Sequence, residues 1–317
     1  MASSKHTPGG KLGIILITGG CGFIGTNLVR YLAGRGCRLR ILDNLSTGKK
    51  ENLAPSFSDN LIIGDVRDRK VVSQAVQGVE AVVHLAACTS VVDSLENPME
   101  VWEVNVTGTI NLLEACRQNS VSRFVLASSN AVVGEQPPPI DELKIPQPLS
   151  PYGASKLAGE ALCRSYYHSF GLETVALRFA NCYGPYSEHK PSIIPKLIKW
   201  AEERRPVTVY GDGNQTRDFI HAVDVAQAIY LALTVDTDSY GQIFQIATGI
   251  ETSINQLVAL VQEVAGRKLR IIYEAERKGE IKRNYSDITK ARRMLGFDPE
   301  ITLREGLKEL WGLRAAK

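Results

Sequence analysis

The stretch Leu16-Ile17-Thr18-Gly19-Gly20-Cys21-Gly22-Phe23-Ile24-Gly25 is the most informative part of this chain. An apolar run at 14–17 predicts a buried strand before the glycines, and the helix-spaced apolar residues 23–32 predict a helix after them. Gly20, Gly22 and Gly25 match the G-x-G-x-x-G pattern of dinucleotide-binding turns. Such a turn brings the backbone close to a pyrophosphate, and the helix N-terminus attracts the phosphates.

An acidic residue ends the next predicted strand, at 38–42. Asp43 lies 18 residues after Gly25, close to the spacing expected for a ribose-binding carboxylate. A carboxylate at this place accepts hydrogen bonds from ribose hydroxyls and repels a 2′-phosphate, so we predict NAD rather than NADP. The alternative interpretations are an ordinary glycine-rich turn and a surface acid at a strand end.

Strands and helices alternate along the chain, which predicts an α/β fold, a Rossmann-type doubly wound parallel sheet. The run at 81–87 is too apolar for a half-exposed strand, so we place it in the centre of the sheet. The remaining expected elements are strands at 61–63, 123–127, 174–179 and 242–246, and helices at 68–76, 98–118, from 151 through 167, and from a Ser253-x-x-Gln256 capping box to 264.

We expect the chain to divide into an NAD-binding part and a substrate-binding part. Residues 12–180 form the Rossmann-type domain, and 214–248 return to it. Residues 181–213 and 249–317 form a smaller C-terminal α/β substrate-binding region. The polar residues 1–11 predict a flexible tail.

Composition limits the partners of the chain. The net charge of +3 over 317 residues is too small to indicate a nucleic-acid partner, and no apolar stretch has the length of a membrane span. The 6 cysteines lack C-x-x-C spacing. This favours free thiols in a reducing, cytoplasmic compartment, and we expect no metal site.

Tyr152 and Lys156 are four residues apart in a predicted helix, so their side chains share one face. The ammonium group, together with the positive charge of an oxidised nicotinamide, favours the phenolate form of the tyrosine. A phenol with an ordinary pKa of about 10 then becomes a usable base near neutral pH. This spacing also arises by chance on helices, and it gains meaning from the glycine turn and from Ser128-Ser129 at a strand end.

With these features the chain resembles the extended short-chain dehydrogenase/reductases, in particular the NAD-dependent nucleotide-sugar epimerases and dehydratases, from residue 14 to residue 313. The motifs that carry the resemblance are residues 18–25, Asp43-Asn44, Gly64-Asp65-Val66, His84-Leu85-Ala86-Ala87, Asn105-Val106-x-Gly108-Thr109, Ser150-Pro151-Tyr152-x-x-Ser155-Lys156, Arg178-Phe179-x-Asn181-x-Tyr183-Gly184-Pro185, residues 211–219 and Arg277-x-Gly279-Glu280.

The resemblance implies a role for each matching residue. Tyr152 is the base, Lys156 holds the nicotinamide ribose and tunes Tyr152, and Ser129 hydrogen-bonds the reacting sugar oxygen. The implied NAD site consists of Gly19, Gly22, Phe23, Ile24, Gly25, Asp43, Asn44, Ser46, Thr47, Gly48, Asp65, Val66, Leu85, Ala86, Ala87, Asn105, Tyr152 and Lys156.

The implied substrate site contains Thr89, Ser129, Asn181, Arg217, Arg277 and Asn284. A guanidinium fork matches phosphate oxygens, so Arg217 and Arg277 suit the diphosphate of a UDP-sugar. A surface ion pair is the alternative for each arginine. Asn284 is seven residues after Arg277. By the resemblance, family members restricted to glucose and galactose have a tyrosine at this position. The smaller asparagine predicts room for an N-acetyl group, unless Tyr285 occupies that position instead.

The triplet after the fifth predicted strand selects among the reactions of the family. The dehydratases of the family have a Thr-Asp-Glu-like triplet at this position, and the decarboxylases have a Ser-Glu-like pair. This chain has Ser129-Asn130-Ala131, which contains no carboxylate. What remains is reversible hydride transfer at C4, which in an epimerase runs in both directions. Tyr152 takes the 4′-hydroxyl proton as hydride passes to NAD, the 4-keto sugar turns over, and hydride returns to its other face. Since NAD is regenerated, it should stay bound.

Three alternatives to a UDP-glucose or UDP-GlcNAc 4-epimerase remain open. One is a UDP-uronate 4-epimerase, with His189 or Lys190 facing the carboxylate. Glu188-His189-Lys190 is first of all expected to be a solvated charge run, and the alternative is contact with a phosphate or a uronic carboxylate. The second is a 4-ketosugar reductase with exchangeable cofactor, and the third is a non-catalytic NAD-sensing protein. Asn130 and Val133 depart from the family pattern beside the reacting sugar. The resemblance also implies a homodimer.

Overall fold

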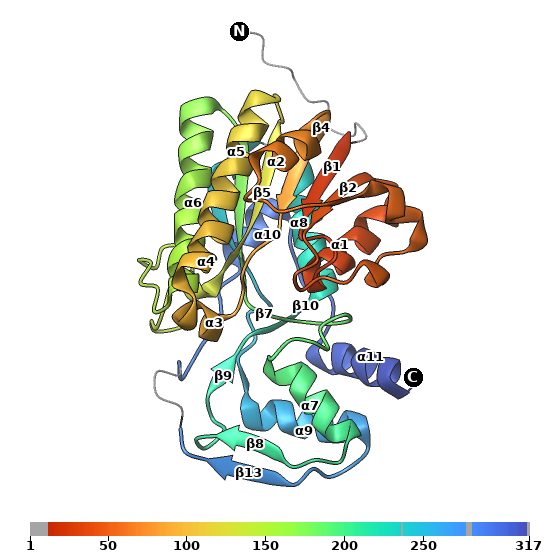
Figure 1. The fold of residues 1–317 in the computed structure, drawn as a ribbon. Coiled ribbons are helices and arrows are strands. Elements are labelled where there is room, and N and C mark those ends of the chain that lie inside the picture. Colours follow the sequence, from red (N-terminus) through yellow and green to blue (C-terminus); the bar gives the residue numbers. More distant parts are fainter. Residues whose placement is uncertain (1–11, 236, 277–280, 316–317) are drawn as a thin grey trace.

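The computed structural model describes residues 12–235, 237–276 and 281–315. Its main part is a parallel sheet of seven strands in the order β11-β6-β5-β4-β1-β2-β3, with helices on both faces (Figure 1). The predicted doubly wound α/β fold is therefore confirmed. The strands of this sheet are β1 Ile14–Thr18, β2 Arg38–Asp43, β3 Leu61–Ile63, β4 Val79–His84, β5 Arg123–Ser129, β6 Glu173–Phe179 and β11 Gln242–Ile246.

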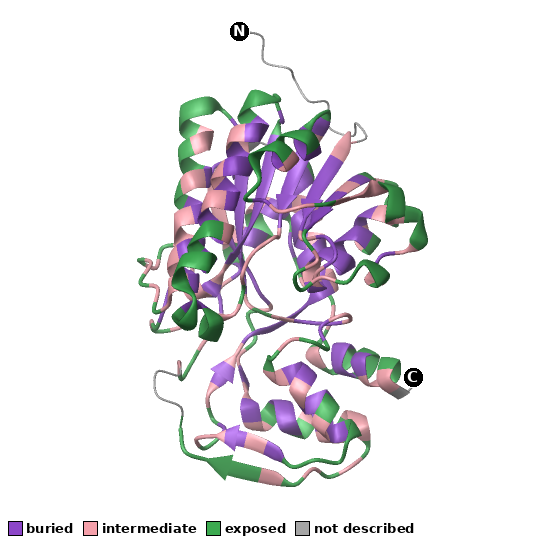
Figure 2. Cartoon of the chain, viewed as in Figure 1, coloured by how far each residue is buried: buried purple, intermediate pink, exposed green. Residues whose placement is uncertain are grey.

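Helices cover the two faces of this sheet in separate groups. One apolar core joins the sheet to α1 (Phe23–Ala33), α8 (Ala222–Thr234) and α10 (Thr289–Leu295). A second core joins it to α2 (Arg69–Val76), α5 (Gly108–Gln118) and α6 (Pro151–Phe170). Both faces are covered, which explains why the strands read as continuous apolar runs. Figure 2 shows the strands buried between the two layers.

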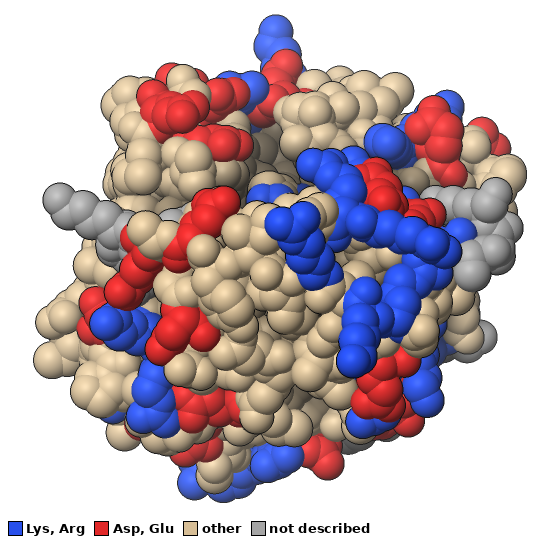
Figure 3. All heavy atoms as spheres, turned by 90° about the horizontal axis from the view of Figure 1, so that it is seen from below, with Lys and Arg blue, Asp and Glu red and all other residues tan. Residues whose placement is uncertain are grey.

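A smaller lobe lies below the carboxyl edge of the sheet (Figure 1). It contains α7 (Ile193–Glu202), α9 (Ile254–Ala265) and α11 (Leu303–Ala315), which share a third apolar core, and the paired strands β8 (Val207–Tyr210) and β13 (Ile271–Glu274). The predicted Ser253 to Gln256 capping box opens α9. Seen from below, Lys and Arg side chains gather in one cluster, with Asp and Glu side chains beside it (Figure 3).

Two pairs of short strands connect the lobes. Strand β7 (Asn181–Tyr183) pairs with β10 (Phe219–His221), and β9 (Thr216–Arg217) pairs with β12 (Thr252–Ser253). Helix α10 falls within the range 249–317 that we expected in the substrate-binding region, but it packs against β11 and α8. The division into domains otherwise stays a prediction.

The predicted helix 98–118 is present, and a π-helical turn lies within it. It consists of α4 (Pro98–Trp102), a π-helical turn at Glu103–Thr107, and α5. The side chain of Asn105, inside the turn, accepts a hydrogen bond from the Cys88 backbone N–H and donates one to the Cys88 carbonyl. Turns of this kind are frequent at functional sites. The shorter helix α3 (Val91–Glu96) precedes α4.

Candidate functional site

The glycine turn lies where the sheet order reverses, because β1 pairs with β2 on one side and with β4 on the other. In open α/β sheets, ligands bind in the crevice at such a switch point. Gly19 has a φ of +69°, and a Cβ atom there would meet the Ala86 backbone. A Cβ atom on Gly25 would overlap the Gly19 carbonyl oxygen. These two glycines therefore permit the tight turn and the close approach of α1 to β1.

Asp43 ends β2 and is buried beside this turn. Its two carboxylate oxygens accept hydrogen bonds from the backbone N–H groups of Cys21 (2.9 Å) and Leu45 (2.8 Å). Each oxygen retains a further lone pair, which suits ribose hydroxyls. A Cβ atom on Gly48 would press on the Cys21 backbone, so the loop with Asn44, Ser46 and Thr47 returns to the glycine turn.

Asp65, after β3, is held by charged and polar neighbours. Its carboxylate accepts hydrogen bonds from the Arg67 guanidinium and from the Asn44 amide. These bonds, those of Arg67 above all, hold the pKa of Asp65 well below its usual range. The adjacent Val66 is buried against α5. This fixed carboxylate faces the same edge of the sheet as Asp43.

The segment after β4 lies against the end of β1, next to the glycine turn. The backbone N–H of Leu85 donates to the Thr18 carbonyl, and that of Ala86 donates to the Thr18 hydroxyl. His84 lies 2.8 Å from the same hydroxyl, and burial lowers its pKa to about 3, so it is neutral. Leu85, Ala86 and Ala87 therefore leave the sheet, and β4 ends at His84 instead of continuing to 87 as predicted.

The cradle made by these segments fits a dinucleotide. The glycine turn leaves α1 without a capping side chain, because its N-cap residue is Gly22. Phe23 and Ile24 follow with the N–H groups of the first helical turn, which suit a pyrophosphate. Asp43 and Asn44 would hold the adenosine ribose, and Asn105, which is bonded to Cys88 just after Leu85 to Ala87, would face it from the β4 side.

The three predicted catalytic residues lie together at the end of β5. Helix α6 begins after its N-cap Ser150, and Tyr152 and Lys156 occupy its first two turns. The Lys156 ammonium donates a 2.9 Å hydrogen bond to the Ala127 carbonyl and lies 5.9 Å from the centroid of the Tyr152 ring. Ser129 ends β5, and its side chain hydrogen-bonds Tyr152. A phenol, a hydroxyl and a cation therefore lie together at the end of β5.

Burial dominates the acid–base properties of these groups. It raises the pKa of Tyr152 to about 12, although the hydrogen bond with Ser129 acts in the opposite direction. It also lowers the pKa of Lys156 to about 8. Lys156 is not among the groups that shift the pKa of Tyr152 in this structure, so its predicted effect on the phenol stays a prediction. The positive charge of an oxidised nicotinamide favours the phenolate when the cofactor is bound.

A buried ion pair between α6 and β6 supports β5, and no local sequence pattern indicated it. The Arg178 guanidinium donates two 2.8 Å hydrogen bonds to the two carboxylate oxygens of Glu160. Ser128, which precedes the catalytic serine, donates its hydroxyl to the same carboxylate. Arg178 is part of a quoted motif, but nothing in its local pattern indicates a partner in α6.

The predicted substrate residues come from several separate segments of the chain. Asn181 begins β7 and is exposed, and Thr89 is exposed before α3. The guanidinium of Arg217 donates to the carbonyls of Thr216 and Ile281. Asn284 is half-buried. Arg277 lies outside the described residues.

A buried polar chain that sequence reasoning missed ties these segments together. Asp218 is fully buried and accepts hydrogen bonds from Thr248, Gly249 and the Ser286 backbone. The Ser286 hydroxyl accepts a 2.9 Å bond from the Asn130 amide. Asn130 thereby links the catalytic strand to the segment that carries Asn284. The only sequence signal was Asp218 beside Arg217 in a motif.

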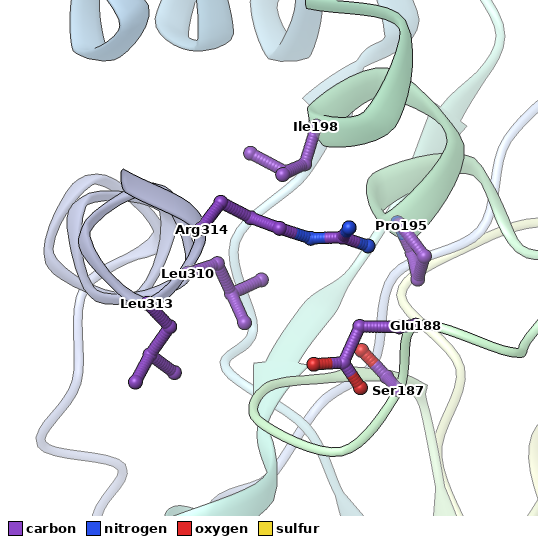
Figure 4. Close-up of a pocket in the computed structure, with 7 residues that line it drawn as sticks. All are labelled: Ser187, Glu188, Pro195, Ile198, Leu310, Leu313 and Arg314. Atoms are coloured by element: carbon purple, nitrogen blue, oxygen red, sulfur yellow. The ribbon is translucent and has the colours of Figure 1, made fainter. Parts of the chain in front are cut away.

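A small hollow lies beside this cleft, between α7, α11 and the loop after β7 (Figure 4). None of the predicted site residues lines it. Across the described ranges 12–235, 237–276 and 281–315, no helix has the length and apolar character needed to traverse a bilayer. The same ranges contain no cluster of metal-binding side chains. The hollow is lined by Ser187, Glu188, Pro195, Ile198, Leu310, Leu313 and Arg314.

Comparisons with known proteins agree with this geometry. The model of the NAD dependent epimerase/dehydratase family matches residues 15–247. A Methanocaldococcus jannaschii protein, provisionally named a UDP-glucose 4-epimerase, is 40% identical over 94% of this chain and 97% of its own length. A UDP-glucuronate 4-epimerase of Thermodesulfobacterium geofontis is 34% identical over 94% of each chain. The UDP-N-acetylglucosamine 4-epimerase of Methanobrevibacter ruminantium, solved with UDP-N-acetylmuramic acid, superposes with a TM-score of 0.90 at 34% identity, covering 96% of this chain and all of that one.

Proposed function

Because this chain belongs to the NAD-dependent epimerase/dehydratase family, we propose that it interconverts the two C4 epimers of a UDP-linked sugar. The observation that carries the proposal is the convergence of Tyr152, Ser129 and Lys156 at the end of β5. A phenol and a hydroxyl at one point suit removal and return of a hydroxyl proton. NAD, when bound, accepts the hydride from C4 and gives it back.

The chain's own residues handle the proton and the geometry. Tyr152 takes the proton of the 4′-hydroxyl group, and Ser129 holds the same sugar oxygen. Lys156 is fixed by the Ala127 carbonyl, so that its cation stays near the phenol. Asn181 and Arg217 hold the nucleotide diphosphate from the lower lobe, and Arg277 is proposed to join them from its sequence position.

Competing reactions of the family need an additional acid near the sugar. Two buried carboxylates in the described chain that connect to the catalytic strand through hydrogen bonds are already engaged. Glu160 is bound by Arg178 and Ser128, and Asp218 accepts several backbone and hydroxyl hydrogen bonds. Residues 129–131 supply a serine, an asparagine and an alanine. This composition supports epimerisation over water loss or decarboxylation.

A chromatographic screen of the purified protein against UDP-glucose, UDP-GlcNAc and UDP-glucuronate tests the proposal. We expect turnover of UDP-glucose or UDP-GlcNAc without added cofactor, because the cycle regenerates NAD. Exclusive turnover of UDP-glucuronate would favour the uronate epimerase. The similarity to the T. geofontis UDP-glucuronate 4-epimerase supports this second candidate. A stoichiometric requirement for added reduced cofactor would favour a reductase. Bound NAD with no turnover of any sugar would favour a sensing role.

The position of Asn284 leads to a prediction about sugar size. We expect Asn284→Tyr to lower kcat/KM for UDP-GlcNAc relative to UDP-glucose, because the larger ring fills the space beside the C2 substituent. Asn284 and Tyr285 are both half-buried, and the Tyr285 carbonyl is fixed by the Ile140 N–H. Tyr285→Asn is the matched control. If only the second variant changes the ratio, the gate is Tyr285, and the sugar-size prediction fails.

We also propose a homodimer. Helices α3 and α4 expose several large apolar side chains, among them Val92, Leu95 and Met99, each more than 60% accessible (Figure 2). Clustered apolar surface of this kind is typical of an interface. We expect light scattering to give twice the mass of one chain, and Met99→Glu to shift the protein toward the monomer. A monomeric wild-type protein would rule the dimer out.

A further inference from the structure

The ammonium group of Lys190 lies beside the glycine turn. Its Nζ atom is 5.7 Å from the centroid of the Phe23 ring, and Phe23 is the first residue of α1. Lys190 comes from the loop after β7, 165 positions after Gly25, so two distant segments meet at the start of this helix. A side chain with a positive charge is thus placed next to a helix N-terminus, which itself carries positive potential.

The charge of Lys190 also acts on two other basic groups. The charge of Lys190 lowers the pKa of Lys156 at the catalytic end. The neighbouring His189 has its pKa lowered by burial, by Lys190 and by Lys49, which follows the loop near Asp43.

Lys190 has no counter-charge within the described ranges 12–235, 237–276 and 281–315. Burial lowers its pKa, and only the Cys182 thiol acts in the opposite direction. Glu188, the carboxylate of the same loop, instead lines the hollow with Arg314 and is not among the groups that act on Lys190 (Figure 4). A half-buried cation beside a helix N-terminus is unfavourable unless an anion completes the site.

The loop that carries Lys190 is held in place. The Asn27 amide of α1 donates a 2.9 Å hydrogen bond to the Pro185 carbonyl. The Ser187 hydroxyl donates to the Gly184 carbonyl, and the Lys190 backbone N–H donates to the Ser187 carbonyl. These contacts fix the base of the side chain relative to α1. The expectation of a freely solvated charge run therefore does not fit Lys190, although Glu188 and His189 are exposed.

We propose that Lys190 is a phosphate-binding residue whose ammonium group pairs with a diphosphate oxygen of a ligand in this cleft. Lysine binds phosphate as a point charge, and here it adds to the N–H groups at the start of α1. The diphosphate belongs either to the bound dinucleotide or to the sugar nucleotide. If it belongs to the sugar nucleotide, the inference rests on the proposed function. Phosphate is favoured over a sugar carboxylate because Phe23 begins the helix that faces the pyrophosphate.

Lys190→Met removes the charge and keeps most of the side-chain length, whereas Lys190→Arg keeps the charge. Lys199→Met is the matched control, because Lys199 is exposed on α7 and pairs with Glu203. Two quantities are measured on each full-length variant. One is the dissociation constant of NAD for protein freed of cofactor. The other is the dissociation constant of UDP for NAD-loaded protein, by calorimetry.

We expect Lys190→Met to weaken one of these two affinities roughly 10- to 100-fold, the range of a charge-assisted hydrogen bond. Lys190→Arg should stay near the wild type, and Lys199→Met should match it. A loss confined to NAD assigns the phosphate to the dinucleotide, and a loss confined to UDP assigns it to the sugar nucleotide. The thermal midpoint of the NAD-free Lys190→Met protein should not fall, because an unpaired cation is removed.

Unchanged affinities for both NAD and UDP in Lys190→Met would overturn the proposal. If that variant lost only the turnover of UDP-glucuronate, the anion would be a carboxylate, and the proposal would also be wrong. The NAD measurement needs no turnover, so absence of epimerase activity in the wild type would remove the proposed function without deciding the role of Lys190.

Discussion

Tyr152→Phe is expected to lower kcat roughly 10²- to 10⁴-fold, while NAD and the UDP-sugar still bind. The variant removes one oxygen atom from a ring that is buried at the end of β5. That oxygen is the group we propose to take the 4′-hydroxyl proton, and Ser129 is its hydrogen-bond partner. The remaining phenyl ring fills the same space, so binding should change little.

The measurement is product chromatography with kcat and KM determined separately, together with the NAD content of the purified variant. Tyr166→Phe is the matched control, because Tyr166 lies on the same helix and its hydroxyl donates to Glu114 on the surface of α5. The control should keep wild-type kcat. Turnover by Tyr152→Phe within a few-fold of the wild type would rule Tyr152 out as the base.

Features that depend on a short piece of sequence were predictable. The glycine turn, its strand and its helix follow from residues 14–32, and the structure places β1 and α1 there. Tyr152 and Lys156 share a helix face because of their spacing alone. The capping box at the start of α9 needed only Ser253 and Gln256, which lie three positions apart. Each of these structures is determined by residues that are close together in the sequence.

Features that depend on contacts between distant segments were not predictable. The π-helical turn at 103–107 coincides with the bonds between Asn105 and Cys88, which lies 17 residues earlier. The helix-spaced apolar residues of 98–118 predicted the helix, but periodicity does not register the single extra residue of the π-helical turn. The burial of Tyr152, which raises its pKa, is another such feature. The sequence shows the nearby lysine, but the extent of burial is a property of the whole fold.

The Glu160–Arg178 pair belongs to the second group, and it is the basis of the largest stability effect that we expect. Glu160→Gln should lower the free energy of unfolding by about 3–5 kcal/mol, the usual cost of removing one partner of a buried ion pair. Both side chains are only 2% exposed, and one Arg178 nitrogen already lacks a partner among the described residues. The variant would leave a buried guanidinium without its counter-charge.

Urea unfolding of NAD-saturated protein measures this effect, with Glu114→Gln as the control. Glu114 pairs with Arg117 at the surface of α5, where a salt bridge contributes about 1 kcal/mol or less. The double variant Glu160→Leu with Arg178→Met should be more stable than Glu160→Gln, because it leaves no buried charge. A loss no greater than that of Glu114→Gln would mean that water or another group compensates Arg178. Since Ser128 donates to Glu160 next to the catalytic Ser129, the expected loss of stability should be accompanied by a lower kcat, which links the support beneath β5 to the chemistry at its end.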